Sequence, residues 1–181
     1  MCGLPSWHEF SLAQYIIGTI YLCQYECIVS MRIVVQRVSE ARVEIGGRVS
    51  GAIGKGLVLF LGIAKQDSHQ QADYLVDKIL GLRIFSDDAG KMNRSVVDIG
   101  GGLLIVSNFT VYGDCRKGRR PSFDLAADPE KAEELYQYFV NRARAAPIQV
   151  ATGVFRASMS VHLVNDGPVT LVCDSAPTSR S

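Results

Sequence analysis

The chain has 181 residues, of which 48% are hydrophobic, a length and composition that suit one well-buried domain and exclude two ordinary ones. Its net charge of +1 excludes a global electrostatic attraction to nucleic acid or to membranes, so such binding would need a local cluster of charges. The five scattered cysteines argue against a disulfide framework and fit a reducing compartment, and with only three histidines we expect a cytoplasmic protein without metal or cofactor.

The first 30 residues differ from the rest of the chain because they contain no Lys or Arg. Their apolar run, residues 12–23, has the length of a signal-peptide core but lacks a positively charged leader and is too short to span a bilayer. We expect an N-terminal extension over 1–30, either non-native or disordered, with a hydrophobic anchor or targeting segment as the alternative. A single domain is expected over 31–174, and a disordered tail over 175–181.

Several strands are expected early in this domain. A first strand covers 32–38, and two short runs on either side of Gly46-Gly47 predict a β-hairpin with a two-residue turn. The continuously apolar run 56–63 is typical of a strand that is buried on both faces.

Two helices follow from capping signals and apolar periodicity. Ser68 and Gln71 form a capping box ahead of one apolar stripe. Asp128 as N-cap and Pro129 in the first turn predict the start of the second helix. The inward-facing residues are expected to be Ala72, Leu75, Val76, Ile79 and Leu80 in the first helix, and Leu135, Phe139 and Ala143 in the second.

Further strands are expected at 83–85, at 103–111 and near the C-terminus, at 157–164 and 169–174. Strands outnumber helices and cluster at both ends of the domain, which is typical of an α+β fold rather than a βαβ repeat. We therefore predict mixed or antiparallel sheets that form a barrel-like core with two main helices.

Common catalytic arrangements find few candidates in this chain. A Ser-His-Asp triad needs an available histidine, whereas His69 opens a surface helix and His162 lies in the middle of a strand. The glycines at 51, 54 and 56 fit neither phosphate-loop nor dinucleotide-loop spacing. An enzyme with this sequence would have little side-chain acid–base equipment.

The stretch "SNFT", residues 107–110, places polar side chains on a strand that should be buried. Strand alternation would put Ser107 and Phe109 on one face and Asn108 and Thr110 on the other. Either these are ordinary strand-end residues that bond to neighbours, or the strand end lines a pocket and directs hydroxyl and N–H groups at a carbonyl.

Two more stretches have both an ordinary and a functional interpretation. Arg116, Lys117, Arg119 and Arg120 form either a solvated loop or a phosphate-binding loop around Gly118. The "NDGPVT" stretch, residues 165–170, is either a turn between two strands or a place where backbone atoms meet a ligand, because Gly and Pro both weaken a strand.

Together, "SNFT", "GRRPSF" and "NDGPVT", at these separations behind "MRIVVQRV", closely resemble the D-aminoacyl-tRNA deacylase family, from Met31 to about Asp174. The family usually has Gln and Leu where this chain has Asn108 and Val111, so a contact specific to Gln is in doubt. The resemblance implies a homodimeric, metal-independent enzyme, outside the membrane, that releases D-amino acids from mischarged tRNA.

The resemblance also implies how the substrate is selected. In this family the pair matching Gly167-Pro168 is joined by a cis peptide bond, which is tolerated almost only before proline. The pair reaches across the dimer into the partner's active site, where its main-chain oxygens exclude an L side chain. Glycine has no side chain to exclude, so glycyl-tRNA is expected to be cleaved too. The 2′-hydroxyl of the terminal ribose is expected to assist the reaction.

Other site residues are carried over position by position. The catalytic set is Ser107, Thr110, Gly167 and Pro168, in which Thr110 is either a nucleophile or a residue that shapes the pocket. The substrate-binding set is Arg37, Asn108, Phe109, Phe155 and Met159. Core packing explains Phe109, Phe155 and Met159 equally well. Arg37 would hold the Gly-Pro tip or the tRNA end, and the alternative for it is an exposed ion pair. The 116–120 loop would contact tRNA.

Two other functions remain open at this point. A non-catalytic nucleic-acid-binding protein would use the same basic loop beside an inactive pocket. A small-molecule esterase would hydrolyse simple esters without regard to the handedness of the amino acid.

Overall fold

The computed structural model describes residues 30–175. The expected extension, apart from Ser30, and the expected tail, apart from Ser175, therefore lie outside the described residues. No helix of the described chain is long and apolar enough to cross a membrane.

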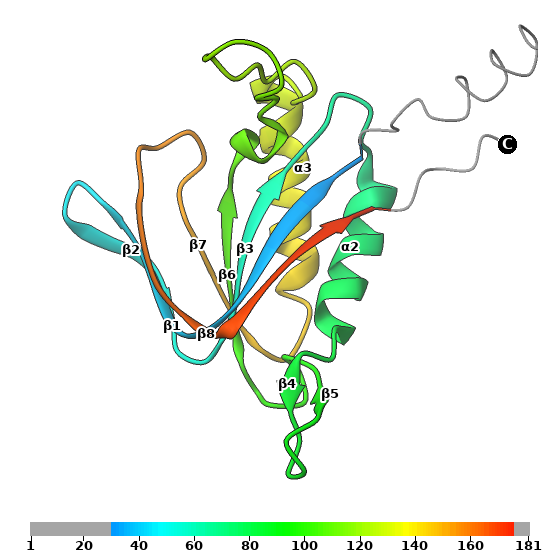
Figure 1. Cartoon of the computed structure of the whole chain (residues 1–181), viewed down its shortest axis with the longest axis vertical. Coiled ribbons are helices and arrows are strands. Elements are labelled where there is room, and N and C mark those ends of the chain that lie inside the picture. The colour runs from blue at the N-terminus through cyan, green and yellow to red at the C-terminus, as the bar shows by residue number, and fades with distance from the viewer. Residues whose placement is uncertain (1–29, 176–181) are drawn as a thin grey trace, which may run out of the picture.

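The fold is built on one curled, mixed sheet (Figure 1). Its strand order is β2-β1-β3-β6-β7, and β8 pairs with the other edge of β1. The β3–β6 and β6–β7 pairs are parallel and the others are antiparallel. The strands are β1 (Arg32–Ile45), β2 (Arg48–Ile53), β3 (Gly56–Gly62), β6 (Gly102–Ser107), β7 (Gln149–Thr152) and β8 (Ser160–Asp174), with a small ribbon of β4 (Phe85–Ser86) and β5 (Met92–Arg94).

The sheet curls until its end strands approach each other. The Gln149 amide on β7 donates a hydrogen bond of 3.0 Å to the Ala52 carbonyl on β2, which nearly closes a barrel. At the β1–β2 turn, Gly46 and Gly47 have φ values of 56° and 78°, as a tight hairpin with two left-handed residues requires. The expected barrel-like α+β fold and its hairpin are confirmed.

Both long helices are the crossovers between parallel strands, so they cover the same face of the sheet (Figure 1). Helix α2 (His69–Gly81) connects β3 to β6, and α3 (Pro129–Ala143) connects β6 to β7. Gln71 Oε1 accepts hydrogen bonds from the Ser68 N–H and hydroxyl, at 2.8 and 2.7 Å, and the Asp128 carboxylate accepts one from the Lys131 N–H. The expected helix starts are confirmed.

The apolar residues form two cores, one on each face of the sheet. One lies between the sheet and the helices and contains Leu57 and Leu59, and the other lies inside the curl and contains Val58. Strand β3 alternates between them, so its continuously apolar sequence reflects burial on both faces, as expected.

The strand predicted next to the site is too long. The strand expected over 103–111 ends at Ser107, and a 3-10 helix, η1 (Phe109–Tyr112), follows. The Asn108 Oδ1 accepts hydrogen bonds from the Thr110 N–H at 3.1 Å and the Thr110 hydroxyl at 2.6 Å, which competes with strand pairing. The face alternation predicted for Asn108, Phe109 and Thr110 therefore does not hold.

The two strands expected at 157–164 and 169–174 form one strand, β8. The strand expected at 32–38 and the first arm of the expected hairpin likewise form one strand, β1. The strand expected at 83–85 forms only at Phe85–Ser86. Along the β1–β8 pair, Gln36 lies opposite Thr170 and Val38 opposite Asn165, so residues 166–169 face Arg37 alone. We call residues 166–169 the Gly-Pro excursion.

Candidate functional site

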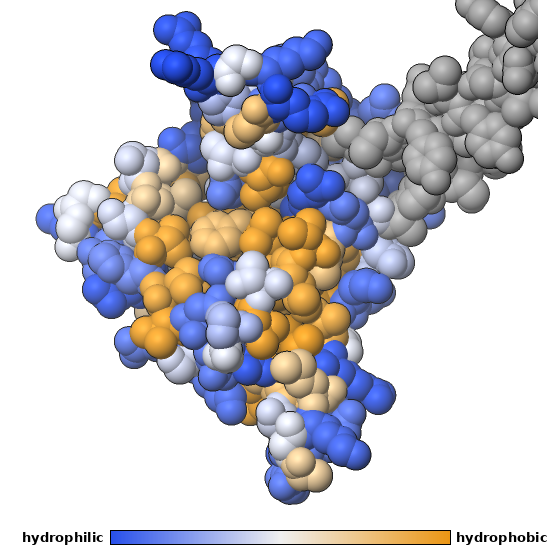
Figure 2. All heavy atoms as spheres, in the orientation of Figure 1, coloured by the Kyte–Doolittle hydropathy of each residue, from blue (hydrophilic) through white to orange (hydrophobic). Residues whose placement is uncertain are grey.

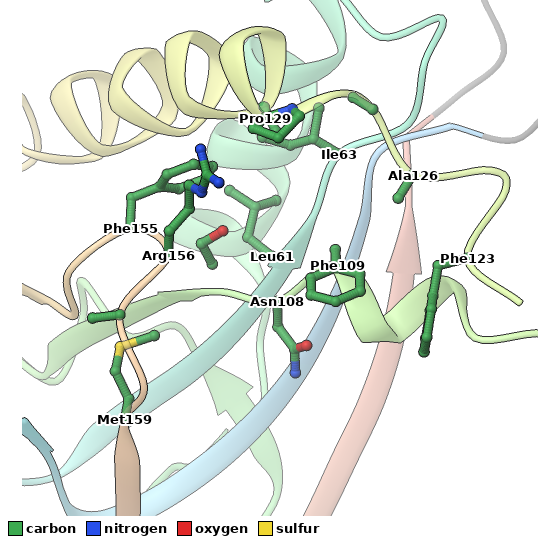
Figure 3. Close-up of a pocket in the computed structure, with 14 residues that line it drawn as sticks. Leu61, Ile63, Asn108, Phe109, Phe123, Ala126, Pro129, Phe155, Arg156 and Met159 are labelled. Carbon is green, nitrogen blue, oxygen red and sulfur yellow. The ribbon is translucent and has the colours of Figure 1, made fainter. Parts of the chain in front are cut away.

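A pocket of about 520 Å³ opens where the parallel strands β3 and β6 end (Figure 3). Its walls come from the last residues of these strands, η1, the segment before α3, the first turn of α3 and the connection from β7 to β8. Crevices at the carboxyl ends of parallel strands are common ligand sites. The fold thus forms a cavity where several separate segments meet.

Five of the residues predicted for the site line this pocket, namely Ser107, Asn108, Phe109, Phe155 and Met159. Thr110 does not line it; it is exposed, and its hydroxyl is engaged by Asn108. Asn108 also donates its backbone N–H to the Leu61 carbonyl at 2.8 Å, which fixes the end of β6 against β3.

Three aromatic rings, those of Phe109, Phe123 and Phe155, line the pocket (Figure 3). The Phe109 ring is 56% exposed and contacts Phe123 edge to face, with ring centroids 5.0 Å apart. A core role for Phe109 is therefore wrong. Phe155 is half-buried and contacts Tyr136 in the helix-side core at a centroid distance of 5.8 Å, so its packing and lining roles coexist.

Polar hydrogen-bond donors are few in this pocket. Within residues 30–175, the Ser107 hydroxyl and the Phe109 N–H, at the start of η1, make no hydrogen bond to another group. N–H groups at a helix start lack partners within the helix and are available to an anionic oxygen. Both groups are therefore available to donate a hydrogen bond to an oxygen atom bound in the pocket.

The pocket contains hardly any charge. Arg156 is the one ionisable side chain among its lining residues, and no carboxylate, histidine, lysine or cysteine of the described residues borders it. His69 instead lies against Tyr138 and Glu134, and His162 against Glu44, both away from the pocket. Within the described chain, the site therefore has no side chain suited to act as a general base.

The Gly-Pro excursion does not line the pocket of its own chain. Gly167 and Pro168 are exposed, and the peptide bond between them is cis. Gly167 has φ 123°, and a Cβ there would lie 2.7 Å from Arg37 Nη2, so no other residue fits without displacement. The sequence thus presents main-chain atoms at this tip.

Arg37 and Asn165 hold the excursion in place. The Arg37 guanidinium is buried; it donates to the Asp166 carbonyl at 3.1 Å and to the Ile84 carbonyl, and it lies 3.2 Å from the Asp166 carboxylate. The Asn165 amide accepts from the Val169 N–H at 3.0 Å and donates to the Thr170 hydroxyl at 3.0 Å. Arg37 thus forms an ion pair, but a buried one, and it holds the excursion rather than lining the pocket of its own chain.

The predicted basic loop is exposed and lies next to the pocket. Asp114 and Ser122 close it by two backbone hydrogen bonds, of 2.8 and 3.1 Å, one residue before the pocket residue Phe123. Hydrogen bonds from Arg116 lower the pKa of Asp114 to about 2. No carboxylate of the described chain pairs with the other three cations, Lys117, Arg119 and Arg120.

Two functional candidates were not predicted from the sequence. Arg156 lines the pocket with a left-handed backbone at φ 61°, which no residue pattern signals. Asn165 closes the excursion, and its position directly before "DGPV" is the only sequence signal for this role. No group of three or more His, Cys, Asp or Glu side chains placed to bind a metal occurs in the described part of the chain.

Comparisons with known proteins give a consistent family. The family model described as "D-Tyr-tRNA(Tyr) deacylase" matches residues 34–174. The D-aminoacyl-tRNA deacylase of Koribacter versatilis is 60% identical over 145 residues, 80% of this chain and 97% of that protein. The D-aminoacyl-tRNA deacylase of Solibacter usitatus is 56% identical over 150 residues, 83% of this chain and 99% of that protein. A solved structure described as "c-Myc DNA Unwinding Element Binding Protein" has a TM-score of 0.76 and 41% identity, covering 81% of this chain and 99% of that one.

Proposed function

The chain belongs to the D-Tyr-tRNA(Tyr) deacylase family and is a D-aminoacyl-tRNA deacylase, and on this premise we propose how its residues perform the reaction. The enzyme hydrolyses the ester between a D-amino acid and the terminal ribose of tRNA, in the cytoplasm, where aminoacyl-tRNA is used. The observation that carries the proposed mechanism is the nearly uncharged pocket, in which Ser107, Asn108, Phe109, Phe155 and Met159 meet.

Chemistry without a protein base suits this substrate. Water attacks the ester carbonyl carbon, the bond to the ribose oxygen breaks, and the proton of the water reaches that oxygen through the neighbouring 2′-hydroxyl of the RNA. The Ser107 hydroxyl and the Phe109 N–H stabilise the carbonyl oxygen as it becomes negative. A substrate that ends in 2′-deoxyadenosine should therefore be cleaved poorly.

Selection against L-amino acids is assigned to the Gly-Pro excursion of a partner subunit. The main-chain oxygens of Gly167 and Pro168 face the bound aminoacyl group and leave no space for an L side chain. This assignment is supported by the exposure of both residues, by their absence from their own pocket and by the anchoring of the excursion by Arg37 and Asn165. Glycine has no side chain for these oxygens to exclude, so glycyl-tRNA is also a substrate.

A homodimer places that excursion in the second pocket. Val34 lies between Val172 and Phe60 on three neighbouring strands, on the sheet face away from the helices. Val172 is 61% exposed, and apolar side chains gather on this face (Figure 2). As far as the structure describes the chain, β8 pairs with β1 alone, so its other edge is free for a second copy.

The basic loop is proposed to contact the tRNA backbone. Lys117, Arg119 and Arg120 are exposed, and the loop that carries them leads directly to the pocket residue Phe123. Cationic side chains around a flexible glycine suit phosphate contacts without base recognition.

The test is hydrolysis of D-tyrosyl-, L-tyrosyl- and glycyl-tRNA by purified protein. We expect release of D-tyrosine and glycine and little release of L-tyrosine. Equal release of both enantiomers, with cleavage of simple esters, would indicate an unselective esterase. Steady protection of glycyl-tRNA would refute rejection by shape alone.

A non-catalytic nucleic-acid-binding role is the second candidate, because the 41% identical solved structure is described as a protein that binds a DNA unwinding element. This role would use the same basic loop. Binding of tRNA or DNA without turnover of D-tyrosyl-tRNA would support it over the deacylase.

A further inference from the structure

Arg156 has an unusual backbone at the pocket wall. It is the single non-glycine residue with positive φ in the stretch 30–175, at 61°. Residues other than Gly, Asn and Asp rarely adopt this conformation, and such outliers tend to cluster at ligand sites. The conformation therefore calls for a functional reason.

The side chain of Arg156 lies where a substrate would pass. The neighbouring residues Phe155 and Ala157 also line the pocket. Figure 3 shows the guanidinium extending along the Phe155 side of the pocket toward Pro129, at the start of α3. It is the one charge that this wall, as described here, presents to a ligand.

No protein group of the described chain neutralises this charge. None of the described carboxylates forms an ion pair with Arg156, and its side chain donates no hydrogen bond within residues 30–175. An arginine at a ligand site, exposed and without a protein partner, is available for a bidentate contact with an anion.

We propose that Arg156 binds the 5′-phosphate of the terminal adenosine of the tRNA, and thereby positions the ester in the pocket. This inference rests on the proposed function. Near the ester the substrate carries two charged groups, the α-ammonium of the amino acid and this phosphate. A guanidinium repels the first and attracts the second. The phosphate therefore lies at the α3 end of the pocket, and Arg156 is a positioning residue.

The experiment compares substrates with and without this phosphate, using the full chain. The variants are Arg156→Gly, which accepts the positive φ, and Arg156→Lys, which keeps the charge without the guanidinium fork. Arg144→Gln is the matched control, because it removes one charge at the opposite end of α3. The substrates are D-tyrosyl-tRNA, D-tyrosyl-adenosine and D-tyrosyl-adenosine 5′-monophosphate.

For Arg156→Gly we expect a fall of about tenfold or more in kcat/KM on the two substrates with the phosphate, mostly as a higher KM. D-Tyrosyl-adenosine should be cleaved at the wild-type rate. The plot of log kcat/KM against log salt concentration for D-tyrosyl-tRNA should become shallower, by a slope of about one, because one phosphate contact is lost. Arg156→Lys should lie between Arg156→Gly and the wild type, and Arg144→Gln should match the wild type.

An equal loss on all three substrates, or no loss on any, would overturn the proposal. A binding measurement tests the phosphate site independently of the proposed deacylase activity. Calorimetry compares the binding of adenosine 5′-monophosphate with that of adenosine. Wild-type protein should prefer the phosphate form, and Arg156→Gly should lose that preference. A preserved preference in Arg156→Gly overturns the phosphate site. Wild-type preference without cleavage of D-tyrosyl-tRNA refutes the deacylase mechanism and supports the phosphate site.

Discussion

Thr110 lies beside the pocket but outside its lining, and its hydroxyl donates a 2.6 Å hydrogen bond to Asn108 Oδ1. This arrangement favours a role for Thr110 in orienting Asn108 over a role as the nucleophile. Each of Thr110→Ala and Thr110→Val should lower kcat/KM on D-tyrosyl-tRNA by about fivefold, since one hydrogen bond contributes about 1 kcal/mol. Thr110→Ser, which keeps the hydroxyl, is the control. Complete loss of turnover in both Ala and Val variants would identify a nucleophile instead.

Asp67 is a buried carboxyl group whose ionisation opposes folding. Its side chain is 4% exposed and accepts hydrogen bonds from the N–H groups of Met31 and Ala64, at 2.8 and 2.6 Å. Burial raises the pKa of Asp67 to about 6, against the effect of these hydrogen bonds and of Lys131. Because the pKa is higher in the folded chain, the protonated Asp67 side chain stabilises the fold. This contribution to the free energy of unfolding is complete below about pH 4 and is lost as the pH rises through 6.

The free energy of unfolding should therefore fall by about 1–3 kcal/mol, from this group, between pH 4 and 7. Urea unfolding of wild type and Asp67→Asn across this range measures it, and the difference between them cancels the other titrating groups. The amide of the variant has a single acceptor oxygen for the two N–H groups, so this variant should be less stable throughout. Parallel pH profiles would contradict the raised pKa.

At the scale of single residues, the polar strand end at Ser107 and Asn108 already indicated a pocket as one of two interpretations, whereas Phe155 and Met159 were predicted only through a family resemblance. Arg156 could not be found in this way, because a left-handed backbone at arginine depends on tertiary contacts. The types of the neighbouring residues in the sequence do not predict such a conformation.

At the scale of elements, the Gly-Pro excursion depends on side chains of neighbouring strand residues. Asn165→Ala removes the hydrogen bonds to Val169 and Thr170 that close it. The tip should then hold its main-chain oxygens less firmly, and the D-over-L ratio of kcat/KM should fall about five- to tenfold. His162→Ala, on the same strand outside the excursion, is the control. An unchanged ratio in Asn165→Ala would separate the excursion from chiral selection.

The helices were predictable because their signals are local: the capping box of α2, the Asp128-Pro129 start of α3 and one apolar stripe in each. The continuity of β8 was not predictable, because its partner β1 lies more than 100 residues away and pairs on both sides of the excursion. The end of β6 was missed because the Asn108 side chain replaces a strand partner. Local rules thus fail where a side chain or a distant strand decides the geometry.

At the scale of the whole molecule, the sheet face away from the helices should be the dimer interface. Val172→Glu places a charge in the row formed by Val172, Val34 and Phe60, which should yield a folded monomer with at least about tenfold lower kcat/KM. Val49→Glu is the matched control, since Val49 on β2 is 58% exposed and Val172 is 61% exposed. Sedimentation and D-tyrosyl-tRNA hydrolysis measure both. A fully active Val172→Glu monomer would refute catalysis across subunits.

The main-chain tip of the Gly-Pro excursion has a consequence for how the protein can change over generations. A specificity pocket made of side chains is retuned by single codon changes, and its discrimination drifts with them. Here the proposed contacting atoms belong to the backbone, and a Cβ at Gly167, whose φ is 123°, would require the Arg37 side chain to shift. Under the proposed mechanism, a point mutation can damage this stereochemical checkpoint but has no residue to exchange for a different preference, so its tolerance of every D side chain and its intolerance of L are inherited as one trait.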